Sequence, residues 1–329
     1  MRRRDAVPTD VPEITRFFDR LGIHFPGPNL EQFVRPSRPA EDLAVVTRLV
    51  LGKSDEIVGL LGYLERPLRV DGRQIRGRWP VNFFLAPELR GQGLGKDLMR
   101  DVMGGCELGL VLGGNPKSIP VLERTGWRRL GDLHTYEWQG RASSFSTQNR
   151  ARPGLPATTP WAEGSGRNGV RRDGVVLSYR FAGPLAPYHR VFHVVDEGTP
   201  TGYFVLSMRR DGPAPGRVKI TDFDASPGTE TQLARAALAT AFDVGSEVEA
   251  HACNVAFRSA FETLSPTRAA VGLPIWVLDP HDLLTAASSS QGTWHITHGD
   301  HDRYRRWTDS VTFCALQENP EPETVLQRP

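Results

Sequence analysis

A glycine-rich loop is the part of this sequence whose residue types and spacing are best suited to chemistry. It reads Arg90-Gly91-Gln92-Gly93-Leu94-Gly95. Glycine permits positive φ angles and lets a ligand reach the main chain. Amides in the first turn of a helix have no partner within the helix, and the helix dipole adds partial positive charge there. A loop of this kind before a helix predicts an anion site, and a diphosphate would fit it.

The flanking sequence predicts the two elements that would hold this loop in place. Residues 81–86 form a mostly apolar run that Pro87 ends, which indicates a buried strand. Leu94, Leu98 and Val102 recur at helical spacing, which indicates a helix with one apolar face. The loop therefore lies where a strand becomes a helix. A glycine-rich turn without a ligand would have the same local pattern, so the loop alone does not decide between the two interpretations.

Spacing separates the phosphate-binding motifs that could apply to the loop. The dinucleotide pattern GxGxxG needs a glycine where the chain has Asp97, and the P-loop needs Gly-Lys-Ser/Thr after four free positions. Neither pattern is met. The pattern that is met is Arg/Gln-x-x-Gly-x-Gly/Ala after a strand that ends near a proline. It resembles the cofactor loop of the GNAT superfamily of N-acyltransferases. The resemblance implies acetyl-CoA or another short acyl-CoA as co-substrate.

A second segment extends this resemblance. Residues 108–112 are expected to form a short strand, and Asn115 followed by proline is typical of a helix start. The helical pattern continues through residues 118–125, and Gly126-Trp127 ends it. In GNAT proteins a strand, an Asn-headed helix and a Gly-aromatic pair follow the cofactor loop in this order. Asn115 could also serve only as a helix cap.

The resemblance implies a cofactor-binding role for three groups of residues. The last residues of the first strand would present backbone groups to the pantetheine arm and the thioester carbonyl. The amides of the loop and of the first helical turn would hold the diphosphate, although Lys96 and Arg100 could equally form a solvated helix face. The expected set is Phe84, Leu85, Ala86, Arg90, Gly91, Gln92, Gly93, Leu94, Gly95, Lys96, Asn115 and Ser118.

The groups that would move protons depart from the family pattern. GNAT enzymes often have a tyrosine just before the glutamate of the second helix, where this chain has Leu122. They often have a glutamate in the strand before the loop, where Asn82 is the only small polar residue. Asn82 could orient a water or polarise a carbonyl, or it could be an ordinary strand residue. His134 titrates near neutral pH and Tyr136 alternates onto the same strand face, so we expect these three residues as the catalytic candidates.

Composition narrows the classes of partner. The chain has 329 residues with 40 basic and 38 acidic side chains, a formal net charge of +2, which favours neither nucleic acid nor a membrane surface as partner. No apolar run approaches the length of a membrane span. Three cysteines far apart suit reduced thiols in a cytoplasm better than a disulfide framework. We therefore expect a cytoplasmic protein that acts on a small-molecule amine.

The sequence predicts two domains of similar fold. Residues 141–169 are rich in Ser, Thr, Pro and Gly and are expected to be a linker. Landmarks of the first half recur about 140 residues later: Gly62-Tyr63 as Gly202-Tyr203, Pro87 as Pro227, and Asn115 as Asn254. We therefore expect an α/β (α+β) protein of two tandem GNAT-like domains, each a mixed central sheet flanked by helices. The expected bounds are 1–140 for the domain with the acyl-CoA loop, 141–169 for the linker, 170–316 for the second domain and 317–329 for a flexible tail.

The second domain is expected to lack a cofactor loop of its own. The repeat places Glu230 where Arg90 lies, and Leu233 and Arg235 where the loop glycines lie. A carboxylate repels phosphate, and side chains prevent a close approach to the backbone. We interpret this domain as a degenerate copy that keeps the scaffold, with a role in shaping the acceptor pocket or in stabilising the first domain.

Two functions remain open on the sequence. The leading one is an acetyl-CoA or short-chain acyl-CoA dependent N-acyltransferase, and a weak likeness to two-domain GNAT proteins of polysaccharide and natural-product gene sets hints at an amino sugar or a specialised metabolite as acceptor. The alternatives are a non-catalytic module on the GNAT scaffold and acyl transfer to oxygen. The cluster His295, His298, Asp300, His301 and Asp302 matches no zinc spacing. No metal is expected there, and a solvated polar loop is the favoured interpretation.

Overall fold

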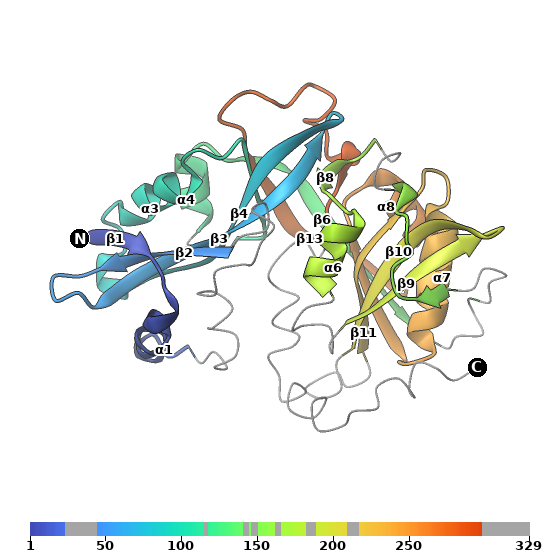
Figure 1. Ribbon diagram of the computed structural model, residues 1–329, viewed down its shortest axis with the longest axis horizontal. Coiled ribbons are helices and arrows are strands. Elements are labelled where there is room, and N and C mark those ends of the chain that lie inside the picture. Colours follow the sequence, from blue (N-terminus) through green and yellow to red (C-terminus); the bar gives the residue numbers. More distant parts are fainter. Residues whose placement is uncertain are drawn as a thin grey trace. The chain divides into compact units, whose positions relative to one another are not determined.

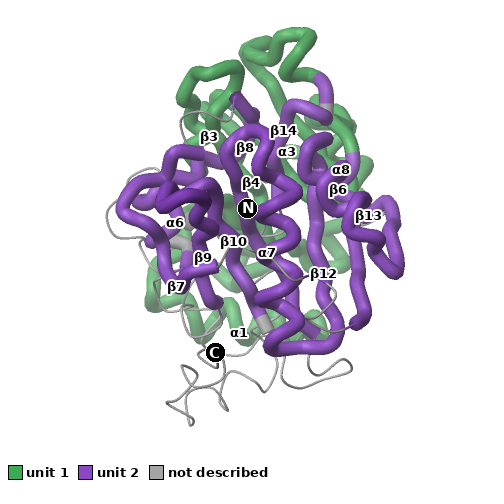
Figure 2. Tube along the Cα trace, turned by 90° about the vertical axis from the view of Figure 1, so that its right-hand side faces the viewer, with its two compact units in different colours: residues 1–131, 274–289 green, residues 132–273, 290–329 purple. Residues whose placement is uncertain are grey.

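The computed structural model describes residues 1–23, 45–114, 118–140, 145, 151–161, 166–181, 189–208 and 217–297. The chain divides into two compact units, and each unit is assembled from two stretches of sequence (Figure 2). Unit 1 contains Met1–Gly131 and Pro274–Ser289, and unit 2 contains Asp132–Leu273 and the chain from Ser290 onward. The expected tail, residues 317–329, lies outside the described residues. No helix in the described part of the chain is long and apolar enough to cross a membrane.

The sheet of unit 1 has its strands in the order β1-β2-β3-β4-β5-β13. The strands are β1 (Arg2–Asp5), β2 (Val45–Leu51), β3 (Ile57–Val70), β4 (Arg73–Leu85), β5 (Leu108–Leu112) and β13 (Arg268–Leu278). Neighbours from β1 to β4 are antiparallel, β4 and β5 are parallel, and the end of β13 is antiparallel to β5. The expected strands before the loop and at residues 108–112 are β4 and β5.

Helices cover both faces of this sheet (Figure 1). They are α1 (Val11–Arg20), α3 (Leu94–Met103) and α4 (Ile119–Arg124), with short 3₁₀ turns at Pro8–Asp10 and Pro87–Leu89. Successive residues of a strand point to opposite faces, and the end of β4 follows this rule. Phe84 meets Phe18 of α1 edge-on at 5.0 Å between ring centroids, whereas Phe83 packs against Gly95 of α3. The predicted stripe Leu94, Leu98 and Val102 is buried in the core of unit 1.

The sheet of unit 2 repeats this design with the order β6-β12-β11-β10-β9-β7. The strands are β6 (Arg128–Gln139), β12 (Glu247–Ala252), β11 (Arg217–Ala225), β10 (Thr199–Met208), β9 (His189–Asp196) and β7 (Ala151–Pro153). Here β11 and β12 form the parallel pair, and the other neighbours are antiparallel. A separate parallel pair joins β8 (Asn168–Val170) to β14 (Trp294–His295), which follows a 3₁₀ turn at Gln291–Thr293.

Helices pack on both faces of the sheet of unit 2. The helices α7 (Glu230–Phe242) and α8 (Val255–Thr263) pack on one face over a large aromatic and aliphatic core. The helix α6 (Gly174–Phe181) packs on the other face, where Leu177 and Phe181 meet Trp161 and Tyr203. Trp161 is fully buried, and it lies in the stretch 141–169 that also contains β7 and β8.

The predicted mixed α/β fold is confirmed, and the two units have a similar order of elements. The strand before the loop ends at Leu85 in β4 and at Ala225 in β11, and the last strand begins at Arg128 in β6 and at Arg268 in β13. Each of these last strands follows one repeat in the sequence but pairs with a strand of the other repeat. Residues 134–139 of β6 pair with β12 in unit 2, and residues 275–278 of β13 pair with β5 in unit 1.

Candidate functional site

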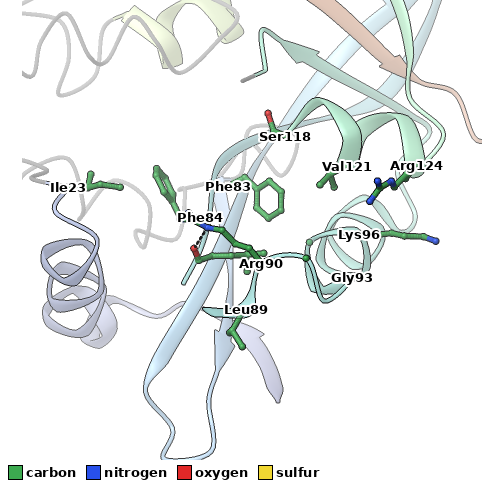
Figure 3. Close-up of a pocket in the computed structure, with 13 residues that line it drawn as sticks. Ile23, Phe83, Phe84, Leu89, Arg90, Gly93, Lys96, Ser118, Val121 and Arg124 are labelled. Atoms are coloured by element: carbon green, nitrogen blue, oxygen red, sulfur yellow. Dashed lines mark hydrogen bonds between the residues drawn. The ribbon is translucent and has the colours of Figure 1, made fainter. Parts of the chain in front are cut away.

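A pocket of about 590 Å³ lies in unit 1 between the end of β4 and the helices α3 and α4 (Figure 3). Its lining residues come from the expected cofactor loop, the end of β4, the helix α4 with its N-cap, and the turn after α1. They are Ile23, Phe83, Phe84, Leu85, Leu89, Arg90, Gly91, Gly93, Gly95, Lys96, Ser118, Val121 and Arg124. The structure therefore brings most of the expected cofactor residues together around one cavity.

The three loop glycines have two different roles. Gly91 and Gly93 have φ angles of +78° and +82°, a region that side-chain-bearing residues rarely adopt, and a Cβ at either position would meet open space. Gly93 is the N-cap of α3. Gly95 lies inside the first turn, where a Cβ would stand 2.9 Å from Cζ of Phe83. The first two glycines shape the turn, and the third lets the helix pack closely on β4.

The amides at the start of α3 are available to a ligand. The N–H groups of Lys96 and Asp97 both donate to the carbonyl of Gly93, at 3.0 and 3.2 Å. Within the described part of the chain, the main-chain N–H groups of residues 91–95 donate to no other group. Gly91, Gly93 and Gly95 line the pocket, and the positive end of the helix dipole lies at the start of α3. The arrangement suits a phosphate group.

Three cationic side chains surround this anion site. Arg90 donates through Nε to the carbonyl of Leu85 at 3.2 Å, which fixes its side chain along the end of β4 (Figure 3). Lys96 of α3 and Arg124 of α4 lie on the same side of the pocket (Figure 3). Neither of these two forms an ion pair with another described residue. Arg124 is not among the residues that the sequence predicts for this site, and its spacing of three residues from Val121 places both on one face of α4.

The pocket also has an apolar lining, which consists of Ile23, Phe83, Phe84, Leu89 and Val121. Val121 lies beside Arg124, whereas Ile23, Phe84 and Leu89 lie away from Lys96 and Arg124 (Figure 3). A pocket that combines unpaired cations with an apolar lining suits a ligand with an anionic end and an uncharged arm.

The end of β4 is shaped for a ligand that runs along it. Pairing between β4 and β5 joins only Gly77 to Leu108 and Arg78 to Gly109 among the described residues, so the two parallel strands diverge beyond that point. The pairing of β3 with β4 skips from Leu60–Phe84 to Gly62–Val81, which leaves two residues of β4 opposite one of β3. This is a β-bulge, and it contains Asn82 with a φ angle of +55°.

Asn82 combines backbone strain with an unsatisfied side chain. An asparagine at positive φ costs on the order of 1 kcal/mol, and such residues cluster at functional sites. Its Nδ2 atom is buried and has no hydrogen-bond partner in the described part of the chain. Asn82 is not among the residues that line the pocket. Its catalytic role stays a prediction.

The other two catalytic candidates, His134 and Tyr136, lie on β6 in unit 2 and do not line the pocket. The hydroxyl of Tyr136 donates to Oε1 of Glu262 at 3.0 Å, and burial raises the pKa of Tyr136 to about 12. His134 is half-buried, and burial together with the charge of Arg258 lowers its pKa. Their catalytic roles also stay predictions.

The remaining expected cofactor residues are near the pocket or outside the described chain. Ala86 and Leu94 are buried beside the loop, and the side chain of Gln92 donates to the carbonyl of Glu88 at 2.7 Å. Asn115 lies outside the described residues, and its counterpart Asn254 in the second repeat caps α8 by accepting from the N–H of Ala256. Leu122, which stands where GNAT enzymes often have a tyrosine, is 3% exposed in the core of unit 1.

The described residues at the start of α7 form no equivalent glycine-rich loop. At the start of α7, Glu230 is buried and forms an ion pair with Arg167. The interpretation of residues 295–302 as a solvated polar loop was wrong for His295, which is 1% exposed and stacked on Phe257. His298, Asp300, His301 and Asp302 lie outside the described residues.

Comparison with solved structures identifies the fold as that of the GNAT superfamily. A GCN5-related N-acetyltransferase from Anabaena variabilis has a TM-score of 0.61 and 14% identity, and the match covers 84% of this chain and 73% of that one. A GCN5-related N-acetyltransferase from Kribbella flavida has a TM-score of 0.54 and 14% identity, with 84% and 70% covered. N-myristoyltransferase from Saccharomyces cerevisiae with bound myristoyl-CoA has a TM-score of 0.56 and 9% identity, with 89% of both chains covered. No family model and no curated protein matches the sequence.

Proposed function

We propose that this protein is an N-acyltransferase that moves an acetyl or other short acyl group from coenzyme A to a small amine. The observation that carries the proposal is the row of unpaired amides at residues 91–95, which opens onto the pocket beside Lys96 and Arg124. A diphosphate bound there would accept hydrogen bonds from the main chain and would be neutralised in part by the two cations. The GNAT fold supports acyl-CoA as the ligand that carries this diphosphate.

The pantetheine arm would follow the free edge of β4. Beyond Arg78 the backbone groups on this edge have no partner on β5, so they can bond the amides of the arm. Phe83, Phe84 and Val121 would pack against its methylene groups. In this placement the thioester would lie near the bulge of β4, and the buried Nδ2 group of Asn82 would have to turn towards the pocket to donate to the carbonyl oxygen.

The reaction needs a neutral amine and a proton for the leaving thiolate. The amine nitrogen forms a bond to the acyl carbon, the carbon–sulfur bond breaks, and one proton passes from nitrogen towards sulfur. We keep His134 as the proposed base, because its lowered pKa leaves the imidazole neutral at neutral pH. We assign no step of the reaction to Tyr136, because its hydroxyl is buried in unit 2 and donates to Glu262.

The acceptor class and location belong to the same proposal. An amino sugar or a natural-product intermediate fits the weak likeness seen in the sequence. The cytoplasm is the proposed compartment, because Cys106 and Cys253 are free thiols and both are buried.

Titration calorimetry with CoA tests the cofactor part of the proposal. We expect saturable binding to the unmodified chain and a loss of at least tenfold in affinity for Gly93→Glu, because a carboxylate at the mouth of the amide row repels the diphosphate. Gly72→Glu is the matched control, since Gly72 has a φ angle of +77° with open space around it but lies in the β3–β4 turn. Equal affinities for the two variants, or no binding at millimolar CoA, would contradict the proposal.

A non-catalytic binding module is the second candidate, and the buried Leu122 at the usual tyrosine position favours it. Thiol release from acetyl-CoA in the presence of a panel of amines distinguishes the two functions. An enzyme releases CoA thiol in proportion to the amide formed, whereas a binding module releases none with any amine. Release with alcohols and not amines would indicate acyl transfer to oxygen.

A further inference from the structure

The second unit contains a cleft between diverging strands, as the first does. In unit 2 the parallel pairing of β11 with β12 runs from Arg217–Glu247 to Ile220–Ala250 and then stops among the described residues. Beyond that point β11 continues to Ala225 and β12 to Ala252. Diverging parallel strands leave backbone groups without ladder partners, and buried groups of this kind need other partners.

A segment of the chain itself lies in this cleft. Residues 294–297 are all at most 1% exposed, and they contact β11 and Cys253, the residue that follows β12. On the β11 side, Nε2 of His295 donates to the carbonyl of Phe223 at 2.6 Å, and Oγ1 of Thr297 donates to Asp222 at 2.7 Å. On the β12 side, Cys253 directly follows the strand, and its thiol donates to the carbonyl of Trp294 at 3.2 Å.

Hydrogen bonds hold this buried segment in place, and its apolar side chains are packed. Because a carbonyl oxygen only accepts, Nε2 of His295 carries a proton in this hydrogen bond. Burial and the nearby charges of Arg172 and Arg167 hold the pKa of His295 well below its usual range, which favours the neutral ring. The N–H of Ile296 donates to the sulfur of Cys253 at 3.2 Å. Trp294 and Ile296 fill the space with apolar atoms.

Arg167 closes the outer end of the same cleft. Its guanidinium donates to the carbonyl of Ala225 at 2.6 Å, and Ala225 corresponds to Leu85 in the 140-residue repeat. It also pairs with Asp224 at 2.6 Å and with Glu230, and it lies over the ring of Phe257 at 4.9 Å. In unit 1 the equivalent carbonyl of Leu85 is bonded by Arg90, and the pocket beside it is open. In unit 2 a residue from another part of the chain occupies this region.

We propose that Trp294–Thr297, with Arg167 at its outer end, is a permanent internal ligand of unit 2 that fills the cleft corresponding to the acyl-CoA cleft of unit 1. If the proposed function holds, this occupied cleft means that each chain binds one acyl-CoA, in unit 1, and that unit 2 binds none. The segment supplies the hydrogen-bond partners that a pantetheine arm would supply in unit 1.

Accessibility of Cys253 tests the occupied cleft without any cofactor. Its thiol is fully buried beneath the segment, and Cys106 in the core of unit 1 is a buried reference thiol at 1% exposed. The full chain is treated with N-ethylmaleimide, and labelling of each cysteine is followed by peptide mass spectrometry. We expect Cys253 to react no faster in native buffer than global unfolding, measured by circular dichroism under the same conditions. Labelling at least tenfold faster than unfolding would show that the segment leaves the cleft and would overturn the proposal.

A variant shows whether the segment is what protects the thiol. A Cβ at Gly169 would stand 2.4 Å from the carbonyl oxygen of His295, so Gly169→Ala presses directly on the segment. Gly154→Ala is the matched control, because Gly154 also has a positive φ angle but open space around it. We expect the ratio of the Cys253 rate to the Cys106 rate to rise at least fivefold in Gly169→Ala and to stay unchanged in the control. An unchanged ratio in Gly169→Ala would contradict the proposal.

The stoichiometry of CoA binding completes the test. We expect one CoA per chain by calorimetry, and no residual binding in Gly93→Glu. Two sites per chain, or a site that survives in Gly93→Glu, would overturn the single-site consequence. If the unmodified chain binds no CoA, the proposed function fails, while the labelling of Cys253 still decides whether the cleft is filled.

Discussion

Lys96 and Arg124 are two cations that the fold does not pair with acidic groups among the described residues. Both line the pocket. Unpaired cations near the unpaired amides of residues 91–95 form a site that would attract a multiply charged phosphate ligand.

Replacement of either cation is expected to weaken CoA binding. For Lys96→Met and Arg124→Met we expect a loss of about fivefold each, since a partly exposed ion pair contributes about 1 kcal/mol. The loss should shrink as salt concentration rises, because ions screen exposed charges. Arg100→Met is the control, since Arg100 is exposed on α3 but does not line the pocket. Affinities that do not change in either pocket variant would show that these cations do not contact the cofactor.

The pH dependence of the reaction tests the proposed role of His134. Because the pKa of His134 is lowered from 6.5, its neutral, basic form predominates above that pH and is lost only as the pH falls through the lowered value. We therefore expect kcat/KM to be level between pH 7 and 8 and to fall on the acid side. In His134→Gln the acid-side fall should disappear along with most of the activity. A profile of unchanged shape in this variant would exclude His134 as the base.

At the scale of elements, the strand, loop and helix that form the anion site could be predicted because they are local in sequence. Proline at position 87 ends β4, paired positive-φ glycines make the turn, and the apolar stripe of α3 sets its buried face. The bulge at Asn82 could not be predicted in this way, because it depends on the register with β3. Arg124 could not be predicted for a similar reason, since its place in the site depends on how α4 packs beside α3.

In unit 2, β13 packs so closely against β6 at Gly272 that a larger residue there should destabilise the protein. A Cβ at Gly272 would stand 2.4 Å from the carbonyl oxygen of Leu133, a backbone atom that cannot move aside cheaply. We expect Gly272→Ala to lower the free energy of unfolding by about 1–3 kcal/mol, as overpacked sites do. Gly174→Ala, at an open position at the start of α6, should be neutral or slightly stabilising. Equal stability of the two variants in urea unfolding would contradict this packing.

At the scale of the whole molecule, the exchange of last strands could not be predicted from the repeat. The 140-residue offset predicts β13 as the counterpart of β6. The residues of either strand do not indicate which sheet the strand joins. The pairings are set by contacts between residues more than 100 positions apart. The burial of Arg167 and His295 in unit 2 has the same origin, since their partners are also distant in sequence.

The exchange predicts how fragments of the chain behave. Residues 1–140 alone lack Pro274–Ser289, which pairs with β5 and supplies Trp276 to the core of unit 1. We expect this fragment to show no cooperative thermal unfolding and rapid proteolysis. Joining residues 274–289 to residues 1–131 through a flexible Gly/Ser linker should restore both cooperative unfolding and CoA binding. A fragment 1–140 that unfolds cooperatively by itself would contradict the structural role of β13.

The most direct test of the whole account is a crystal structure of the protein with CoA. We expect the diphosphate oxygens within hydrogen-bonding distance of the amides of residues 91–95, with Lys96 and Arg124 beside them and the arm along β4. Density for CoA at any other place on the chain, with these amides left in contact with solvent, would contradict the central claim.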